Sequence, residues 1–196
     1  MKKIILLISF AMLGRVLAAQ HPGPVQNDAQ LTFDLEDTLR LLTVLFDSDN
    51  INDTTGDVLW KPVSFADAVE VNLSDDGYVH TNLDTVLYFD TYGVHHAVVV
   101  FTTFHYEQGH VSDCHACGAQ LSIAVFDEAP VTGRWQVRQF AKHLTALGGY
   151  GANGIVGLLQ FGENQWALSL DMIWFGQGIS SEYIEFRNLD NLQKVF

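Results

Sequence analysis

Short strand-like segments separated by glycine-bearing turns are the feature that most constrains the fold of this chain. From residue 85 onward, runs rich in β-branched and aromatic residues recur, and each is bounded by a polar turn. Tyr92-Gly93 forms a plausible two-residue hairpin turn, and the turns GENQ and GQG separate the last three runs. Strands at such spacing are typical of an antiparallel meander. The runs are 85–91, 94–106, 121–127, 134–140, 154–161, 166–175 and 179–186.

One segment before these runs has a helical pattern. Leu35, Leu39, Leu42 and Phe46 recur at helical spacing, and acidic residues occupy the first turn, so we expect a helix over about 34–46. The sequence therefore predicts an α+β fold, with an N-terminal helix packed on a curved antiparallel sheet, a meander of about seven strands. The uninterrupted apolar run AVVVF predicts one strand buried on both faces.

The first 19 residues have the composition of a signal peptide. Lys2 and Lys3 precede an apolar run, 4–13, and the small residues Ala-Ala close the segment. The apolar run is shorter than the roughly 20 residues that a membrane span requires. We therefore expect residues 1–19 to be removed during export, and we expect the mature protein in the periplasm or outside the cell.

The mature chain is strongly acidic. Removal of Lys2, Lys3 and Arg15 takes the formal charge from −13 to −16 (−13 minus 3). Nucleic acids and anionic membranes bind clustered Lys and Arg, so this charge disfavours both partners, and we expect no membrane association after signal cleavage. Length and composition predict an extended leader over 20–33 and a single globular domain over 34–196. The partner is a protein or a small molecule that the sequence does not identify.

The most concentrated chemistry lies in HYEQGHVSDCHACG, which begins at His105. Cys114 and Cys117 supply half of a tetrahedral metal site, because Cys-x-x-Cys spacing lets both thiolates bind one ion. His110 and His105 are the candidates that complete it, with His115 as the alternative. Soft thiolate ligands select zinc or cuprous copper as the cofactor.

A disulfide is the competing reading of Cys114 and Cys117. Export brings the pair into an oxidising compartment, where a disulfide is the default outcome, and both readings stay open with equal weight. Covalent haem attachment is excluded because Gly118 stands where the axial histidine is required. A redox-active pair on a scaffold other than thioredoxin stays possible, because a strand-like run follows where thioredoxin has a helix.

Two loops partly match known ligand-binding sequence patterns, and neither match is complete. The acidic loop 47–57 fails the EF-hand template at Ile51, Asn52 and Val58, so we expect a solvated loop, with a looser calcium site as the alternative. The glycine-rich loop 148–154 matches G-x-G-x-x-G, but a strand rather than a helix follows. A small ligand on the concave face of the sheet near that loop is a further hypothesis, lined by Tyr150, Trp166 and Trp174, although core packing is favoured for the tryptophans.

The remaining histidines carry weaker signals. His95 and His96 are adjacent on a strand, so their side chains point to opposite faces and cannot easily bind one metal. We expect both to be surface residues flanking a buried strand. His80 and His143 are isolated in the sequence and indicate nothing.

The stretch CHACGAQLSIAVFDEAPVTGRWQVRQF, 114–140, resembles a pattern in exported bacterial proteins, where a CHAC motif precedes a strand ending in Phe, a turn and a Trp-bearing strand. The resemblance implies that 114–140 is one structural unit and implies no substrate. The sequence predicts an exported binding or structural domain with a Cys/His centre at 105–117 that holds a metal ion or a disulfide. The alternative is a periplasmic thiol-disulfide or metal-dependent enzyme that uses Cys114 and Cys117.

Overall fold

The computed structural model describes most of the chain after the expected leader. The described residues are 31–52, 56–60, 79–104, 106–107, 110–111, 119–147, 154–176 and 179–195. Their elements in chain order are β1 (Thr32–Phe33), α1 (Thr38–Phe46), β2 (Val58–Trp60), β3 (Val79–Thr91), β4 (Val94–Phe104), β5 (Tyr106–Glu107), β6 (His110–Val111), β7 (Ala119–Glu128), β8 (Trp135–Leu147), β9 (Ile155–Gly162), β10 (Gln165–Gly176) and β11 (Ile179–Asn188).

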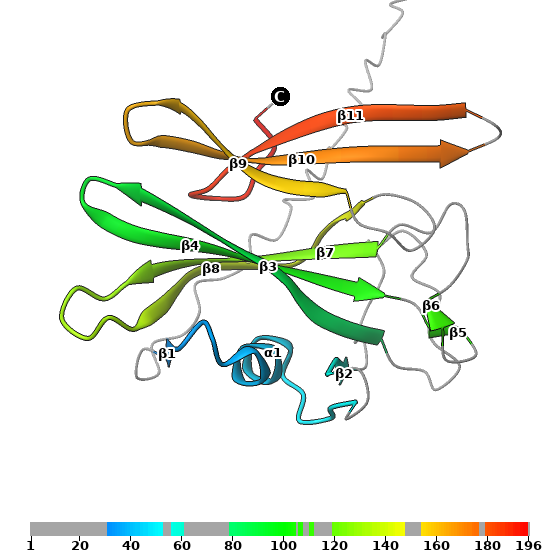
Figure 1. The fold of residues 1–196 in the computed structure, drawn as a ribbon, viewed down its shortest axis with the longest axis horizontal. Helices are drawn as coiled ribbons and strands as arrows, with labels where there is room; N and C mark the ends of the chain where they lie inside the picture. The colour runs from blue at the N-terminus through cyan, green and yellow to red at the C-terminus, as the bar shows by residue number, and fades with distance from the viewer. Residues whose placement is uncertain are drawn as a thin grey trace, which may run out of the picture.

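Two antiparallel sheets face each other. The larger sheet has six strands in the order β1-β8-β7-β4-β3-β2, and the smaller has three in the order β11-β10-β9. Figure 1 shows the three-stranded sheet over one face of the larger sheet and α1 against the other face. The strands β5 and β6 pair separately at one end.

The fold is therefore mostly β, which corrects the prediction of an α+β fold with one meander. The prediction was right that the strands are antiparallel and that a helix packs on a sheet, but the helix has only nine residues. The reason for a second sheet lies in β4 and β7, whose central residues are buried on both faces. One short helix covers one face of these strands, and β9, β10 and the segment after β11 cover the other.

Strand β4 confirms the prediction of a strand buried on both faces. Val99 and Phe101 belong to the apolar cluster that includes the helix. Val98 and Val100 belong to the cluster shared with the three-stranded sheet. The alternation of side chains along one strand thus joins both apolar clusters.

Helix α1 begins later than the sequence predicted. Asp37 is its N-cap, and the Asp37 carboxylate accepts a hydrogen bond from the Arg40 backbone N–H at 3.1 Å. Asp34 instead caps the preceding turn, where its carboxylate accepts from the Glu36 N–H at 3.0 Å. The helix ends at Phe46, whose ring lies 5.4 Å from that of Phe101 on the sheet.

Two loop predictions have different outcomes. Tyr92 and Gly93 have positive φ values of 50° and 79°, so the predicted two-residue hairpin turn between β3 and β4 is confirmed. The loop 47–57 is not wholly solvated, because Asp57 is only 3% exposed and its carboxylate lies 3.5 Å from His80 Nδ1. Its residues 53–55 lie outside the described part of the chain.

Candidate functional site

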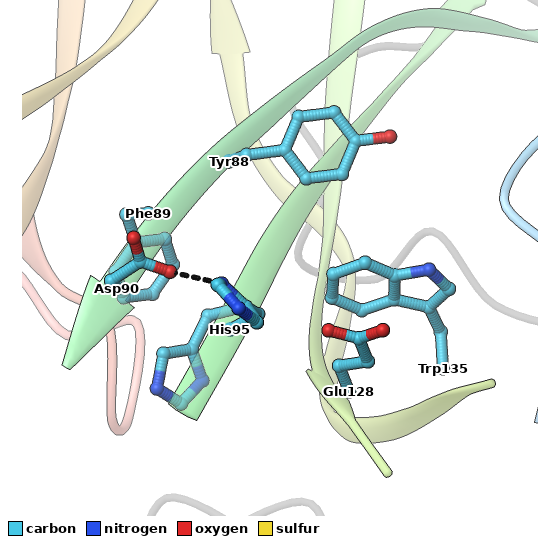
Figure 2. Close-up of a pocket in the computed structure, with 7 residues that line it drawn as sticks. Tyr88, Phe89, Asp90, His95, Glu128 and Trp135 are labelled. Atoms are coloured by element: carbon cyan, nitrogen blue, oxygen red, sulfur yellow. Dashed lines mark hydrogen bonds and ion pairs between the residues drawn. The ribbon is translucent and has the colours of Figure 1, made fainter. Parts of the chain in front are cut away.

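A cleft of about 380 Å³ opens at the hairpin end of the six-stranded sheet. Strands β3, β4, β7 and β8 contribute its side chains, and Figure 2 shows the side chains around it. We call it the hairpin cleft. Its lining residues are Tyr88, Phe89, Asp90, His95, His96, Glu128 and Trp135.

Strand register places these residues together. Asp90 pairs across the β3–β4 hairpin with His95, and Glu128 pairs across the β7–β8 connection with Trp135. Successive side chains on a strand alternate between faces, so Tyr88 shares the face of Asp90. Each hairpin therefore delivers a carboxylate and a ring to the same end of one sheet face.

The aromatic side chains of the cleft differ in exposure to solvent. The rings of Tyr88 and Trp135 have centroids 5.8 Å apart and are tilted by 49°. Tyr88 is 62% exposed, whereas Trp135 is half-buried and packs against the apolar cluster that includes the helix. Figure 2 shows the Glu128 carboxylate beside the Trp135 indole, and the Asp90 carboxylate hydrogen-bonded to the His95 ring. An exposed aromatic ring that packs on a second ring beside polar groups is typical of a binding surface.

His96 forms a hydrogen-bonded chain behind the cleft. Its Nδ1 lies 2.6 Å from an Asp127 carboxylate oxygen, and its Nε2 lies 2.5 Å from the Thr91 hydroxyl. The Phe89 ring stacks on the imidazole at 4.8 Å. His96 is 5% exposed, which corrects the prediction that it is a surface residue. His95 is exposed on the opposite face, as predicted.

Thr91, His96 and Asp127 follow the order hydroxyl, imidazole, carboxylate, which is the order of the catalytic groups in acyl-transfer enzymes. Such enzymes also need N–H donors that converge on an oxyanion. The backbone N–H of Tyr92, next to Thr91, already donates to the Asn164 side chain at 2.8 Å. The Asp127 carboxylate is also held by Arg138 at 3.3 Å. We therefore interpret this chain as a clamp that fixes the β3–β4 hairpin.

A second cavity, of about 460 Å³, lies between the two sheets near the same hairpin. Trp166 lines it, packs against the apolar cluster and donates its indole N–H to the Asp90 carbonyl at 3.1 Å. Trp166 therefore has the core-packing role favoured from the sequence and also lines a cavity. Tyr150 and the Trp174 side chain lie outside the described part of the structure.

The structure describes only a few residues of the predicted Cys/His centre. Cys114, Cys117, His105 and His115 lie outside the described residues, and His110 is described only as a backbone position in β6. The segment connects β4 to β7, which are neighbours in the sheet, as the antiparallel pairing of these two strands shows. Within the described residues, no group of three or more His, Cys, Asp or Glu is placed to hold a metal ion.

His80 and His143, which sequence reasoning passed over, lie at the sheet end nearest that segment. His80 pairs across the strands with Phe104, the residue before His105, and it is buried beside Asp57. His143 has a positive φ of 54° at an irregularity in the β7–β8 pairing, and its ring lies 5.0 Å from Trp60. No local pattern marks either residue, because both environments depend on pairing between distant strands.

Burial controls ionisation at this end. Desolvation by burial, and to a smaller extent the positive charge of Lys142, lower the pKa of His143 to about 4. Desolvation also lowers the pKa of Lys142, although the Asp47 carboxylate acts in the opposite direction. The Lys142 ammonium lies 4.3 Å from the centroid of the Trp60 ring and 5.1 Å from that of Phe46.

Comparison with known proteins adds no family to these observations. The chain matches no protein-family model, no curated protein and no solved structure. The one described helix is too short to cross a membrane.

Proposed function

We propose that this protein is an exported binding domain that holds a ligand in the hairpin cleft. The observation that carries the proposal is the ring pair of exposed Tyr88 and half-buried Trp135 in a concave surface that also contains carboxylates. Ligand sites are concave, combine aromatic walls with a few polar groups, and have volumes of roughly 300–1,000 Å³. Export rests on the signal peptide expected over residues 1–19.

Binding at this cleft is testable without a known ligand. We expect a fragment screen by NMR on the mature protein to yield at least one class of compounds that shifts the amides of Tyr88, Glu128 and Trp135. Replacing Tyr88 with alanine should weaken these compounds about tenfold or more, because a ring wall of the site is lost. Tyr92→Ala is the matched control, since Tyr92 is an exposed tyrosine of the same hairpin outside the cleft. The proposal would be contradicted if fragments shift only amides outside the cleft, or if their affinity is the same for Tyr88→Ala as for the wild type.

We also propose that the segment 105–117 holds a metal ion or a disulfide. Support comes from spacing and from position, since the segment connects two buried neighbouring strands whose ends are fixed. A metal or a covalent bridge would stabilise such a connection. The enzyme alternative, a thiol-disulfide or metal-dependent activity at Cys114 and Cys117, rests on the same residues.

The amounts of bound metal and of free thiol in this segment can be measured directly. Mature protein, exported natively and purified without chelator, is expected to contain either about one zinc or copper ion per chain or neither metal nor free thiol. Elemental mass spectrometry and thiol titration on one sample separate the two. A metal should be lost on changing Cys114 to serine and retained in His95→Ala, which removes an exposed histidine outside the segment. Two free thiols without metal would contradict both readings, and ready cycling of a disulfide would favour the enzyme alternative.

A further inference from the structure

Neither carboxylate of the hairpin cleft is paired with a lysine or an arginine among the described residues. Among the described residues, the Glu128 carboxylate makes no ion pair, and the lining of the cleft contains no lysine or arginine. In the part of the chain that the structure describes, the Asp90 carboxylate is bonded to the His95 ring, and both side chains are about two-thirds exposed. The chain as a whole carries a formal charge of −13. The cleft therefore attracts positive charge.

The ring pair adds a second, independent attraction for the same kind of ligand. The faces of tryptophan and tyrosine rings carry negative electrostatic potential and attract a cation within about 6 Å of the ring centroid. The rings of Tyr88 and Trp135 touch at an angle of 49°, so they form one angled aromatic surface with the Glu128 carboxylate beside it. The protein uses the same contact internally, where the Lys142 ammonium lies 4.3 Å from the centroid of the Trp60 ring.

Other ligand classes fit less well. An anion would meet two carboxylates without a fixed positive group among the described lining residues. A neutral sugar could lie on an aromatic ring, but it would leave the negative charge of Glu128 uncompensated. A positively charged ligand uses both features of the cleft.

We propose that the hairpin cleft binds an organic ammonium group, placed against the Tyr88 and Trp135 rings on their cleft side and neutralised by the Glu128 carboxylate. This inference rests on the proposed binding function and names its ligand class. Asp90, held by His95, contributes a second negative charge at the far side of the cleft.

Choline and 3,3-dimethyl-1-butanol provide the sharpest test, because they share a shape and differ in charge. We expect NMR titration of the mature protein to show choline binding about tenfold more tightly than the uncharged alcohol, with shifts at Tyr88, Glu128 and Trp135. Glu128→Gln keeps the side-chain shape and should weaken choline severalfold, while leaving the alcohol unchanged. Choline affinity should also fall as salt increases. Tyr92→Ala is the control that should bind choline normally.

The possible outcomes separate this inference from the function it rests on. Equal binding of choline and the alcohol, or unchanged choline affinity in Glu128→Gln, overturns the ammonium assignment. A cleft that takes cellobiose or another neutral compound and ignores choline overturns the assignment and leaves the binding function standing. If neither these probes nor the fragment screen shifts the cleft residues, both proposals fail. A thermal unfolding curve of Glu128→Gln that matches the wild type shows that any loss reflects the site.

Discussion

Replacing Phe101 with alanine is expected to lower the free energy of unfolding by about 3–5 kcal/mol. Phe101 is 0% exposed on β4, where its ring lies 5.4 Å from that of Phe46 and 6.4 Å from that of Phe140. One side chain thus joins the helix to the centre and the far side of the six-stranded sheet. The substitution removes the ring and leaves a cavity that three separate elements would have to close together.

Chemical denaturation of the mature protein measures this loss. The matched control is Phe161→Ala, because Phe161 is the same residue type on β9 and is 64% exposed. We expect that variant to lose less than about 1 kcal/mol, since most of its ring already contacts water. Equal losses in the two variants would show that Phe101 is not the centre of the helix-facing core.

The local parts of this fold were predictable because local chemistry determines them. The β3–β4 hairpin was predictable from Gly93, which accepts without steric cost a positive φ value that a two-residue turn requires. The end of α1 at Phe46 also follows from the spacing of apolar residues. The sequence did not indicate that the six-stranded sheet ends with β8 at Leu147 and that β9 begins a second sheet. Strand periodicity is the same in one sheet or two, and only the need to cover both faces of β4 separates them.

Of the two candidate sites, one was predictable from local sequence and the other was not. Cys114 and Cys117 were visible because their chemistry depends on a spacing of three residues. The hairpin cleft was not, because it joins Tyr88 to Trp135 through the register of four strands. Neither residue stands out in its own segment, since aromatic residues are common in strands. A site of this kind is detectable only when cross-strand partners are known.

Stability is expected to fall as the pH is lowered from about 6.5 to about 4, and His143 is expected to account for about 2 kcal/mol of the loss. The folded protein keeps His143 neutral because burial, and then Lys142, lower its pKa from 6.5 to about 4. The unfolded chain binds the proton at the ordinary pKa, so between these values the unfolded state binds more protons and is favoured by acid. The full shift corresponds to about 3.4 kcal/mol at 1.36 kcal/mol per pKa unit, and partial exposure of the half-buried ring reduces that figure.

His143→Asn isolates this contribution from the other histidines and the carboxylates. Asparagine tolerates the positive φ of 54° at this position and does not titrate, although it loses the ring contact with Trp60. The variant should therefore be less stable at pH 7, and the difference from wild type should shrink by about 2 kcal/mol at pH 4. Urea denaturation across this range gives both curves. Parallel curves would mean that His143 has the same proton affinity folded and unfolded, and that burial at the β8 irregularity does not hold the imidazole neutral.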